Sequence, residues 1–525
     1  MTRVLIADKL SESALDVFEA RGIAADFNPG LAPDALIACI GNYDGLAVRS
    51  ATKVTAEVVA AAGALRVVGR AGIGVDNIDV PSATARGIVV MNTPSGNSIT
   101  TAEHAVALIF ALARDLPAAD RSTRAGKWEK SRFMGVELTG KTLGVIGCGN
   151  IGSIVCDRAL GLKMRVLAYD PYLSGDRASA LRVEKVELDA LLQRADFITL
   201  HVPLNDATRN ILDAAALGRT KPGVRIVNCA RGGLIDEAAL AAALESGHVA
   251  GAALDVFAEE PARDNPLFGI ENIVVTPHLG AATAEAQENV AVQVAEQMAD
   301  YLLDGAIQNA VNMPSISPEE APRLRPYIAL AEQLGSFAGQ ITETGIDALT
   351  IEYSGEAAEL NTRSLTAAAL TGLLRPLLDQ VNMVNAPVLA RERGIEVTEI
   401  KRDRVGDYSN LIGLTLRTER RTRSVEGSLL GGDRPRIVGI EGIKTEAQLG
   451  PFMLYIRNQD VPGIIGYLGK TLGDAGVNIA TFHLGRMEAG GEAIALIKVD
   501  EDPGPEVLAT LRGLPAIRQA KVLRF

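Results

Sequence analysis

Of the five histidines in the chain, His278 is the best placed for acid–base chemistry. It follows "NIVVTP", an apolar run typical of a buried strand, so we expect it at the sheet edge where parallel sheets bind ligands. A histidine there can exchange a proton near neutral pH. His104 lies inside a predicted helix as a core or interface residue, His248 lies in an exposed turn, and His483 is far from the other motifs. His201 also follows a strand and could border a cofactor, but packing explains it better.

A histidine base works better with a carboxylate behind it, and "ALDVFAEEP" supplies candidates after another apolar run. These are Asp255, Glu259 and Glu260. Two adjacent acids cannot both point inward along an extended chain, and spacing does not choose between them. A solvated acidic loop is the alternative interpretation.

Arg231 lies in "NCARGGLIDE", where a predicted strand ends and a glycine turn begins. A guanidinium at the mouth of a core needs an anionic partner. That partner is either one of the acids above or the carboxylate of a substrate, which the planar fork of arginine fits well. A nicotinamide beside an arginine and a histidine–acid pair would describe a 2-hydroxy-acid dehydrogenase.

A dinucleotide-binding motif is present in "KTLGVIGCGNIGSIV". Gly147 permits the tight turn, Gly149 lets the backbone approach a pyrophosphate, and Gly152 lets helix and strand pack closely. The helix N-terminus then faces the phosphates. Asp170 ends the next strand, roughly 20 residues further on, where an acid binds the ribose 2′-hydroxyl. Such an acid repels a 2′-phosphate, so the motif predicts NAD rather than NADP.

Short β-branched runs alternate with alanine-rich helical stretches up to about residue 280, which predicts parallel sheets with helices on both faces. The rhythm restarts near residue 141, so two doubly wound α/β units are expected. Thr100 and Glu103 fit a capping box for the long helix between them. A helix over 283–305 is expected to return to the first unit. A mixed α+β segment follows, and 451–525 reads as βαββαβ, a ferredoxin-like order.

Composition narrows the classes of protein. The chain has 525 residues, 47% of them apolar, and a net charge of −12, which argues against a nucleic-acid partner. No apolar run approaches about 20 residues, so no membrane span is predicted. The four cysteines have neither paired nor metal-ligand spacing, which predicts reduced thiols and no metal site. Together with an N-terminus unlike a signal peptide, this predicts a cytoplasmic location.

The motifs "GRAGIGVDNID", "MNTPSGNS", "NCARGGLIDE", "GAALDVFAEEP" and "PHLGA" occur in an order that resembles the long-form D-3-phosphoglycerate dehydrogenases, within the D-2-hydroxy-acid dehydrogenase family. The resemblance implies a substrate domain (1–97 and 283–312), an NAD-binding Rossmann domain (98–282), an intervening domain (313–450) and an ACT regulatory domain (451–525). It also implies oxidation of 3-phosphoglycerate with NAD, as the first step of L-serine biosynthesis.

The resemblance assigns roles to individual residues. The substrate clamp would be Arg231, the acid Glu260 rather than Glu259, and the base His278. Two positions depart from a common form of the family, because Ile73 and Val202 stand where threonines often occur. The cofactor would lie against Gly147, Gly149, Asn150, Ile151, Gly152, Asp170, Val202, Cys229, Ala230, Asp255, Gly280, Ala281 and Ile73.

Substrate phosphate requires cations. Arg49 and Arg70 each follow a predicted strand of the first unit and could bind an anion, and Gly72, Gly74 and Asn97 complete the expected substrate residues. Lys127, Lys130 and Arg132 form a basic arm that could reach a partner subunit or be ordinary surface cations.

The C-terminal segment suggests regulation. Asp460 precedes Pro462-Gly463, where a strand turns into a helix, and Asn478 opens the following strand, so the turn offers groups for both ends of an amino acid. Resemblance to ACT domains implies L-serine, bound at Asn458, Asp460, Gly463 and Asn478 between two chains of a homo-oligomer, with a dimer of dimers expected. The alternatives are another D-2-hydroxy-acid dehydrogenase, such as a hydroxypyruvate or glyoxylate reductase, an NAD-sensing corepressor, and a tail that only dimerises.

Overall fold

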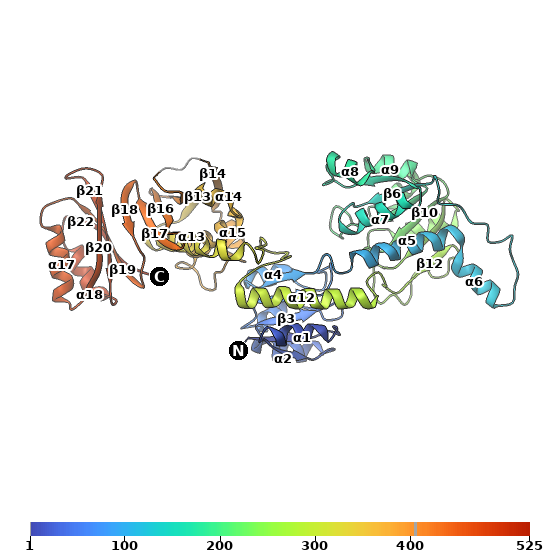
Figure 1. Cartoon of the computed structure of the whole chain (residues 1–525), viewed down its shortest axis with the longest axis horizontal. Helices are drawn as coiled ribbons and strands as arrows, with labels where there is room; N and C mark the ends of the chain where they lie inside the picture. Colours follow the sequence, from blue (N-terminus) through green and yellow to red (C-terminus); the bar gives the residue numbers. More distant parts are fainter. Residues whose placement is uncertain (1, 404–406) are drawn as a thin grey trace.

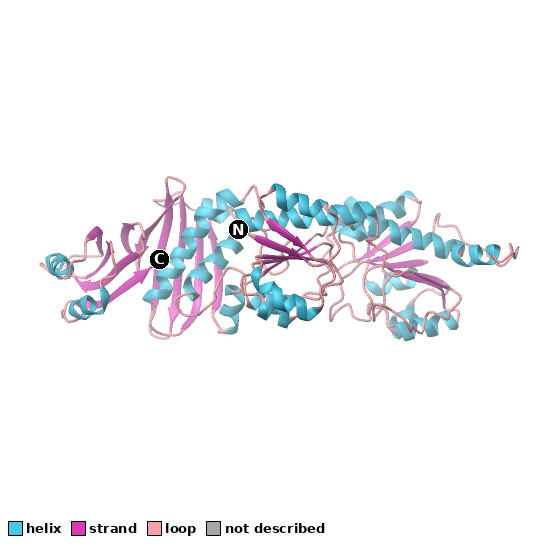
Figure 2. Cartoon of the chain, turned by 90° about the horizontal axis from the view of Figure 1, so that it is seen from below, coloured by secondary structure: helices cyan, strands magenta, loops and turns pink. Residues whose placement is uncertain are grey.

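The computed structural model describes residues 2–403 and 407–525. Within these residues the chain forms four β-sheets that lie in a row along an elongated molecule, with the N-terminal sheet between the second and the third (Figure 1). Two parallel sheets carry helices on both sides, as the view in Figure 2 shows. The predicted fold class is confirmed, with two parallel α/β sheets, one mixed sheet and one antiparallel sheet.

The first sheet is parallel, and its order β2-β1-β3-β4-β5 is that of flavodoxin-like folds. Its central strands consist mainly of apolar residues that are buried between helices on both faces. The strands are β1 (Arg3–Ile6), β2 (Ala24–Phe27), β3 (Gly45–Val48), β4 (Val67–Arg70) and β5 (Val89–Asn92). The helices are α1 (Ser13–Ala20), α2 (Pro33–Cys39), the 3-10 turn η1 (Ile40–Asn42), α3 (Ala56–Ala61) and α4 (Val80–Ala85).

A distant helix completes this first unit. Helix α12 (Ala284–Asp304) begins at its N-cap Thr283 and packs on α1, β3, β4 and β5. Gly69 on β4 leaves the space that the helix needs, because a Cβ there would lie 2.3 Å from Sδ of Met298. The helix therefore joins the end of the second unit to the first sheet.

The second sheet is also parallel and reads β8-β7-β6-β9-β10-β11-β12, which is the Rossmann order with one further strand. Its strands are β6 (Thr142–Ile146), β7 (Arg165–Tyr169), β8 (Glu184–Lys185), β9 (Phe197–Leu200), β10 (Val224–Asn228), β11 (Val249–Leu254) and β12 (Ile273–Val275). Its helices are α5 (Ser98–Arg114), α6 (Leu116–Arg124), α7 (Asn150–Gly161), α8 (Gly175–Leu181), α9 (Leu188–Arg194), α10 (Ala214–Arg219) and α11 (Glu237–Glu245).

The predicted capping box at Thr100 is wrong. Helix α5 begins at Ser98 with Asn97 as its N-cap, so Thr100 lies inside the first turn. The Thr100 hydroxyl instead lies 3.3 Å from the hydroxyl of Thr283, the N-cap of α12.

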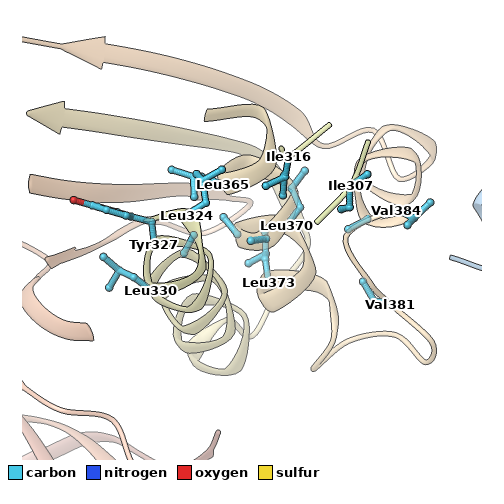
Figure 3. Close-up of a cluster of buried hydrophobic side chains, with 14 of the residues drawn as sticks. Ile307, Ile316, Leu324, Tyr327, Leu330, Leu365, Leu370, Leu373, Val381 and Val384 are labelled. Atoms are coloured by element: carbon cyan, nitrogen blue, oxygen red, sulfur yellow. The ribbon is translucent and has the colours of Figure 1, made fainter. Parts of the chain in front are cut away.

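The third sheet is mixed, in the order β14-β13-β15-β16-β17-β18. Helices α13 and α15 pack against each other very closely, because a Cβ on Gly335 would meet the Ala369 carbonyl at 2.0 Å. Figure 3 shows Leu324 and Tyr327 of α13 gathered with Leu370 of α15 and with Ile307 and Ile316. The elements are α13 (Ala321–Ile341), β13 (Ile346–Gly355), α14 (Glu356–Glu359), α15 (Thr362–Leu374), α16 (Ala386–Glu392), β14 (Glu396–Arg402), β15 (Asn410–Thr418), β16 (Thr422–Leu430), β17 (Arg434–Ile440) and β18 (Ile443–Ala447).

The fourth sheet is antiparallel, in the order β20-β21-β19-β22, and the predicted βαββαβ order is confirmed. Two helices cover the face away from the third sheet (Figure 1). The elements are β19 (Phe452–Gln459), α17 (Ile464–Asp474), β20 (Ile479–Arg486), β21 (Glu492–Val499), α18 (Gly504–Arg512) and β22 (Ile517–Arg524).

Neighbouring units are joined by specific contacts. The side-chain amides of Asn382 and Asn385 donate to the carbonyls of Gly87 and Ala85 in the first unit. Lys521 of β22 donates to the Gln340 carbonyl at the end of α13. Among the described helices, none combines the length and apolar character needed to cross a bilayer.

Candidate active site

A cleft of about 1320 Å³ opens where the carboxyl ends of the strands of the two parallel sheets face each other. The first sheet contributes Arg49 after β3 and Arg70 at the end of β4. The second contributes Arg231 after β10 and His278 after β12. The cleft therefore gathers the predicted chemical groups from segments far apart in the sequence, at the edge where doubly wound sheets bind ligands.

His278 and Glu260 form a close pair. Nδ1 of His278 lies 2.6 Å from Oε2 of Glu260, and the other carboxylate oxygen accepts the backbone N–H of Phe257 at 3.1 Å. Burial tends to raise the pKa of Glu260, but the hydrogen bonds from His278 and Phe257 outweigh it and lower this pKa. The structure thus brings Glu260, of the two adjacent acids, against the imidazole.

His278 is held in an unusual backbone conformation, with a φ of 56°. Non-glycine residues adopt this left-handed region at a cost, and such strain persists where the surroundings fix it. Here the N–H of His278 donates to the Asp255 carbonyl at 2.9 Å. The loop after β12 therefore presents the imidazole in a defined direction.

Asp255 lies beneath that loop and not in the cleft. Its side chain is fully buried, and its oxygens accept hydrogen bonds from Thr276 Oγ1 and from the N–H groups of Leu279 and Gly280. Nε2 of His104 lies 3.3 Å from the same carboxylate. The bonds from Thr276, Leu279 and Gly280 fix the loop that carries His278, and Asp255 does not line the cleft. A direct contact between Asp255 and a cofactor stays a prediction.

Arg231 is paired with an acid that the sequence did not single out. Its Nε donates to Oδ2 of Asp76 at 2.9 Å, and its Nη1 donates to the Ala230 carbonyl at 2.6 Å. None of Asp255, Glu259 and Glu260 is its partner among the described residues. The sequence does place an acid, Asp76, within the glycine-rich "AGIGVDN". Its pairing with a residue 155 positions away could not be predicted from the sequence.

Arg70 carries an unmet hydrogen-bonding group. Its Nε is buried without a partner, and its Nη1 makes only a 3.3 Å bond to the Ala71 carbonyl. Burial, followed by repulsion from Arg231 and Arg49, lowers the pKa of Arg70 to about 10. Three guanidinium groups thus lie near one another, as expected of a site for a multiply charged anion.

The two glycines expected among the substrate residues have a clear steric role. A Cβ on Gly72 would lie 1.5 Å from Nη1 of Arg70, and a Cβ on Gly74 would lie 1.7 Å from Nη2 of Arg231. Each guanidinium therefore lies on bare backbone, and a side chain at either glycine would displace it.

The turn after β6 has the geometry of a pyrophosphate site. Gly147 has a φ of 91°, and a Cβ on Gly152 would meet the Gly147 carbonyl at 2.0 Å, whereas a Cβ on Gly149 would meet nothing within 4 Å. Space is therefore left at Gly149, beside the start of α7, which is the geometry that a pyrophosphate site requires. Asp170 follows β7 and accepts the N–H groups of Cys148 and Tyr172 at 2.8 Å each.

Most of the other predicted cofactor and substrate residues line the same cleft, and two lining residues carry unmet polar atoms. Oδ1 of Asn97 and Nδ1 of His201 are buried without hydrogen-bond partners. Burial lowers the pKa of His201 to about 4. Unpartnered buried atoms at a cleft fit a site that a polar ligand completes. The predicted residues lining the cleft also include Ile73, Asn150, Ile151, Val202, Cys229, Ala230, Gly280 and Ala281.

The basic arm lies outside this cleft. Lys127, Lys130 and Arg132 are all exposed, and Arg132 is within ion-pair distance of Glu129 and Glu271. Trp128 between them is 88% exposed. In a single chain the arm contributes nothing to the candidate active site.

The four expected regulatory residues do not share one environment. Asp460 accepts hydrogen bonds from Arg486 and from the N–H of Gly490, and Asn478 donates to Asp500. Gly463 begins α17 with a φ of 89° and open space at its Cβ position. The Asn458 side chain is fully buried, its Nδ2 donates to the Gln459 carbonyl, and its Oδ1 has no hydrogen-bond partner.

Three segments of the chain match known protein families. Residues 106–280 match the family described as D-isomer specific 2-hydroxyacid dehydrogenase, NAD binding domain. Residues 323–441 match the D-3-phosphoglycerate dehydrogenase intervening domain, and 452–516 match the ACT domain.

Individual relatives agree with these matches. The D-3-phosphoglycerate dehydrogenase of Synechocystis sp. is 44% identical, covering 100% of this chain and 95% of that protein. The Bacillus subtilis protein of the same name is 41% identical, covering 100% and 99%. Among solved structures, the TT0316 protein from Thermus thermophilus is 35% identical with a TM-score of 0.55, covering 59% of this chain and 100% of that one. A glyoxylate reductase from Paecilomyes thermophila is 29% identical with a TM-score of 0.55, covering 59% and 98%.

Proposed function

The chain belongs to the D-3-phosphoglycerate dehydrogenase family, and from this premise we propose that its cleft oxidises the C2 hydroxyl of 3-phospho-D-glycerate with NAD. The product is 3-phosphohydroxypyruvate, which enters L-serine biosynthesis. The observation that carries the proposal is the meeting of a His278–Glu260 pair with Arg231 and Arg70 in one cleft.

NAD is the cofactor of this domain family, and the residues present fit it. The turn at Gly149 and the start of α7 would hold the pyrophosphate, and Asp170 would bind the ribose diol. When bound, NAD supplies the acceptor for the hydride that leaves C2. The chain's own residues bind and orient the substrate and move its proton.

Each of these residues has a distinct task. Arg231 binds the substrate carboxylate, while Arg70 and Arg49 bind the phosphate. Because Nδ1 of His278 faces Glu260, the proton of the C2 hydroxyl passes to Nε2 of His278. Glu260 then stabilises the imidazolium that forms, in the manner of other oriented acid–histidine pairs.

The direct test is NADH formation by purified full-length chain from 3-phosphoglycerate, with glycolate and D-lactate as competing substrates. Turnover of 3-phosphoglycerate in preference to both is expected. Arg231→Lys keeps the charge but loses the fork, so kcat/KM is expected to fall while NAD affinity holds. Turnover of glycolate or lactate alone would make the chain a different 2-hydroxy-acid dehydrogenase.

The two C-terminal units extend the proposal. The two solved structures match only 59% of this chain, whereas the D-3-phosphoglycerate dehydrogenase relatives match all of it, including the residues of the intervening and ACT domains. This favours the proposed activity over a glyoxylate reductase or a corepressor. L-serine is proposed as the effector of the ACT unit. A homo-oligomer is also proposed, supported by the exposed apolar residues Ile99, Leu116, Trp128 and Met134 on one stretch of chain. A cytoplasmic location stays a prediction.

A further inference from the structure

The guanidinium of Arg231 is fastened from two directions. Its own strand end supplies the Ala230 carbonyl, which accepts Nη1 at 2.6 Å. The opposite wall of the cleft supplies Asp76, which accepts Nε at 2.9 Å. Asp76 follows β4 of the first sheet and Arg231 follows β10 of the second, so this ion pair spans the two α/β units.

The loop that carries Asp76 is itself fixed. Nδ2 of the adjacent Asn77 donates to the carbonyls of Arg49 and Thr52, at 2.8 Å and 2.7 Å. Nδ2 of Asn92 donates to the Ile73 carbonyl at 2.6 Å. The backbone around Asp76 is therefore fixed, and its side chain, although 63% exposed, is held by the ion pair with Arg231.

The third side of the guanidinium rests on Gly74, where no side chain separates Nη2 from the backbone. Asp76 takes the Nε position, and its negative charge disfavours a second anion on that edge. Nη1 already donates to the Ala230 carbonyl, so a bidentate carboxylate would use the second N–H of Nη1 together with Nη2.

Charge in the cleft points the same way. Among the described lining residues the cations are Arg49, Lys53, Arg70 and Arg231, and the acids are Asp76 and Glu260. Glu260 is engaged by His278, so Asp76 is the carboxylate beside the arginines. An acid in this cleft weakens the electrostatic attraction of an anionic substrate. Its presence is explained if Asp76 orients the guanidinium of Arg231.

We propose that Asp76 is a positioning residue for substrate recognition: it holds Arg231 so that the terminal edge of the guanidinium receives the substrate carboxylate. The proposal rests on the assignment of Arg231 as the carboxylate clamp under the proposed function. Asp76 itself touches neither the substrate nor the reacting atoms.

The test compares Asp76→Ala, which removes the acceptor, with Asp76→Asn, which keeps an oxygen for Nε. Asp76→Ala is expected to lower kcat/KM for the 2-hydroxy acid by about 10- to 100-fold, mainly through KM, as for the loss of one hydrogen bond to a charged group. Asp76→Asn is expected to recover most of this loss. The affinity for NADH is expected to stay unchanged in both variants. Asp26→Ala, which removes the exposed partner of Arg3 in the same unit, is the matched control and should leave all values unchanged.

A double-mutant cycle separates positioning from a general structural effect. Arg231→Lys has no Nε, so Asp76→Ala should cost little in that background. The proposal would be overturned if Asp76→Ala lowered kcat/KM equally in both backgrounds, or if Asp76→Ala had wild-type kinetics. A lower KM in Asp76→Ala would also overturn it, because Asp76 would then compete with the substrate for Arg231.

A binding measurement keeps this result distinct from the proposed function. Oxalate, a carboxylate probe without phosphate, is titrated calorimetrically onto the NADH complexes of wild type and Asp76→Ala. Weaker binding to the variant supports the proposal, and equal or tighter binding overturns it. If the wild type oxidises another 2-hydroxy acid instead of 3-phosphoglycerate, the proposed substrate is wrong. The double-mutant cycle is then measured with that acid, and it still tests the role of Asp76.

Discussion

Nδ1 of His278 lies 2.6 Å from Oε2 of Glu260, which leaves Nε2 as the imidazole nitrogen that faces a proton donor. The pair is fixed from both ends. The second oxygen of Glu260 accepts the Phe257 N–H, and the backbone of His278 is tied to Asp255. Because its hydrogen bonds lower the pKa of Glu260, the carboxylate is ionised when a proton arrives on the imidazole.

The first prediction concerns this pair. His278→Ala is expected to lower kcat by about 10²- to 10⁴-fold, the usual weight of general acid–base catalysis. Glu260→Gln keeps an acceptor but loses the charge, so kcat is expected to fall by less than in His278→Ala. Steady-state kinetics check both, and adjacent Glu259→Gln is the control. Near-wild-type turnover in His278→Ala would remove this histidine from the mechanism.

The second prediction concerns Arg70, whose charge is buried beside two other arginines. Arg70→Met keeps an apolar stem but removes a charge whose pKa is lowered to about 10, first by burial and then by repulsion from Arg231 and Arg49. We expect the ligand-free protein to melt a few degrees higher, because an unpaired buried charge is lost. KM for 3-phosphoglycerate should rise by about 10- to 100-fold.

Thermal melting with and without inorganic phosphate checks the same point. Phosphate should raise the melting temperature of the wild type more than that of Arg70→Met, with Arg3→Met as a surface control. An equal phosphate effect in all three proteins would place the anion site elsewhere.

Local spacing predicted the dinucleotide turn well, because the roles of Gly147, Gly149 and Gly152 depend only on a strand, a turn and a helix start. Long-range pairing was not predictable in the same way. Nothing in the spacing chose Glu260 over Glu259, since that choice depends on how the chain bends between Asp255 and His278. Asp76 was missed for the same reason, because its partner comes from another sheet.

Other differences came from local geometry. The capping motif at Thr100 matched in sequence, but α5 starts earlier at Ser98, so the motif falls inside the helix. Strand β2, "AADF", has no β-branched residue and gave no strand signal. Cys148 and Cys156 have no paired spacing, yet their Sγ atoms lie 3.9 Å apart because the turn folds back on α7.

The third prediction uses His201, whose Nδ1 is buried. Burial lowers the folded-state pKa of His201 to about 4, below the value near 6.5 of an unfolded chain. The unfolded state therefore binds the proton first, and stability is lost as pH falls from about 6.5 towards 4. The loss between pH 7 and pH 5 is about 2 kcal/mol from this residue.

Denaturant unfolding at the two pH values measures this loss of stability. The unfolding transition of the NAD-binding unit is identified as the one that NADH shifts to higher denaturant concentration. His201→Gln cannot titrate, so its stability should change by about 2 kcal/mol less over the same interval. An identical pH dependence in both proteins would mean that His201 is protonated alike in the folded and unfolded chains.

The last prediction concerns serine and the ion pair between Asp460 and Arg486. The Gly490 N–H and the Arg486 guanidinium lower the pKa of Asp460, so its carboxylate is ionised and already partnered. An amino acid bound at the turn of Gly463 would place its ammonium on that carboxylate in competition with Arg486.

Two substitutions should therefore act in opposite directions. Asp460→Ala should raise the serine concentration for half-inhibition, and Arg486→Ala should lower it, because the carboxylate is freed. Asn478→Ala should also relieve inhibition. Rates across millimolar L-serine and calorimetric titration measure these shifts, with D-serine as the control. Binding must favour an inactive arrangement for any inhibition to follow. No heat of binding together with unchanged rates would leave the ACT unit as a structural module, and parallel shifts in Asp460→Ala and Arg486→Ala would place serine away from this ion pair.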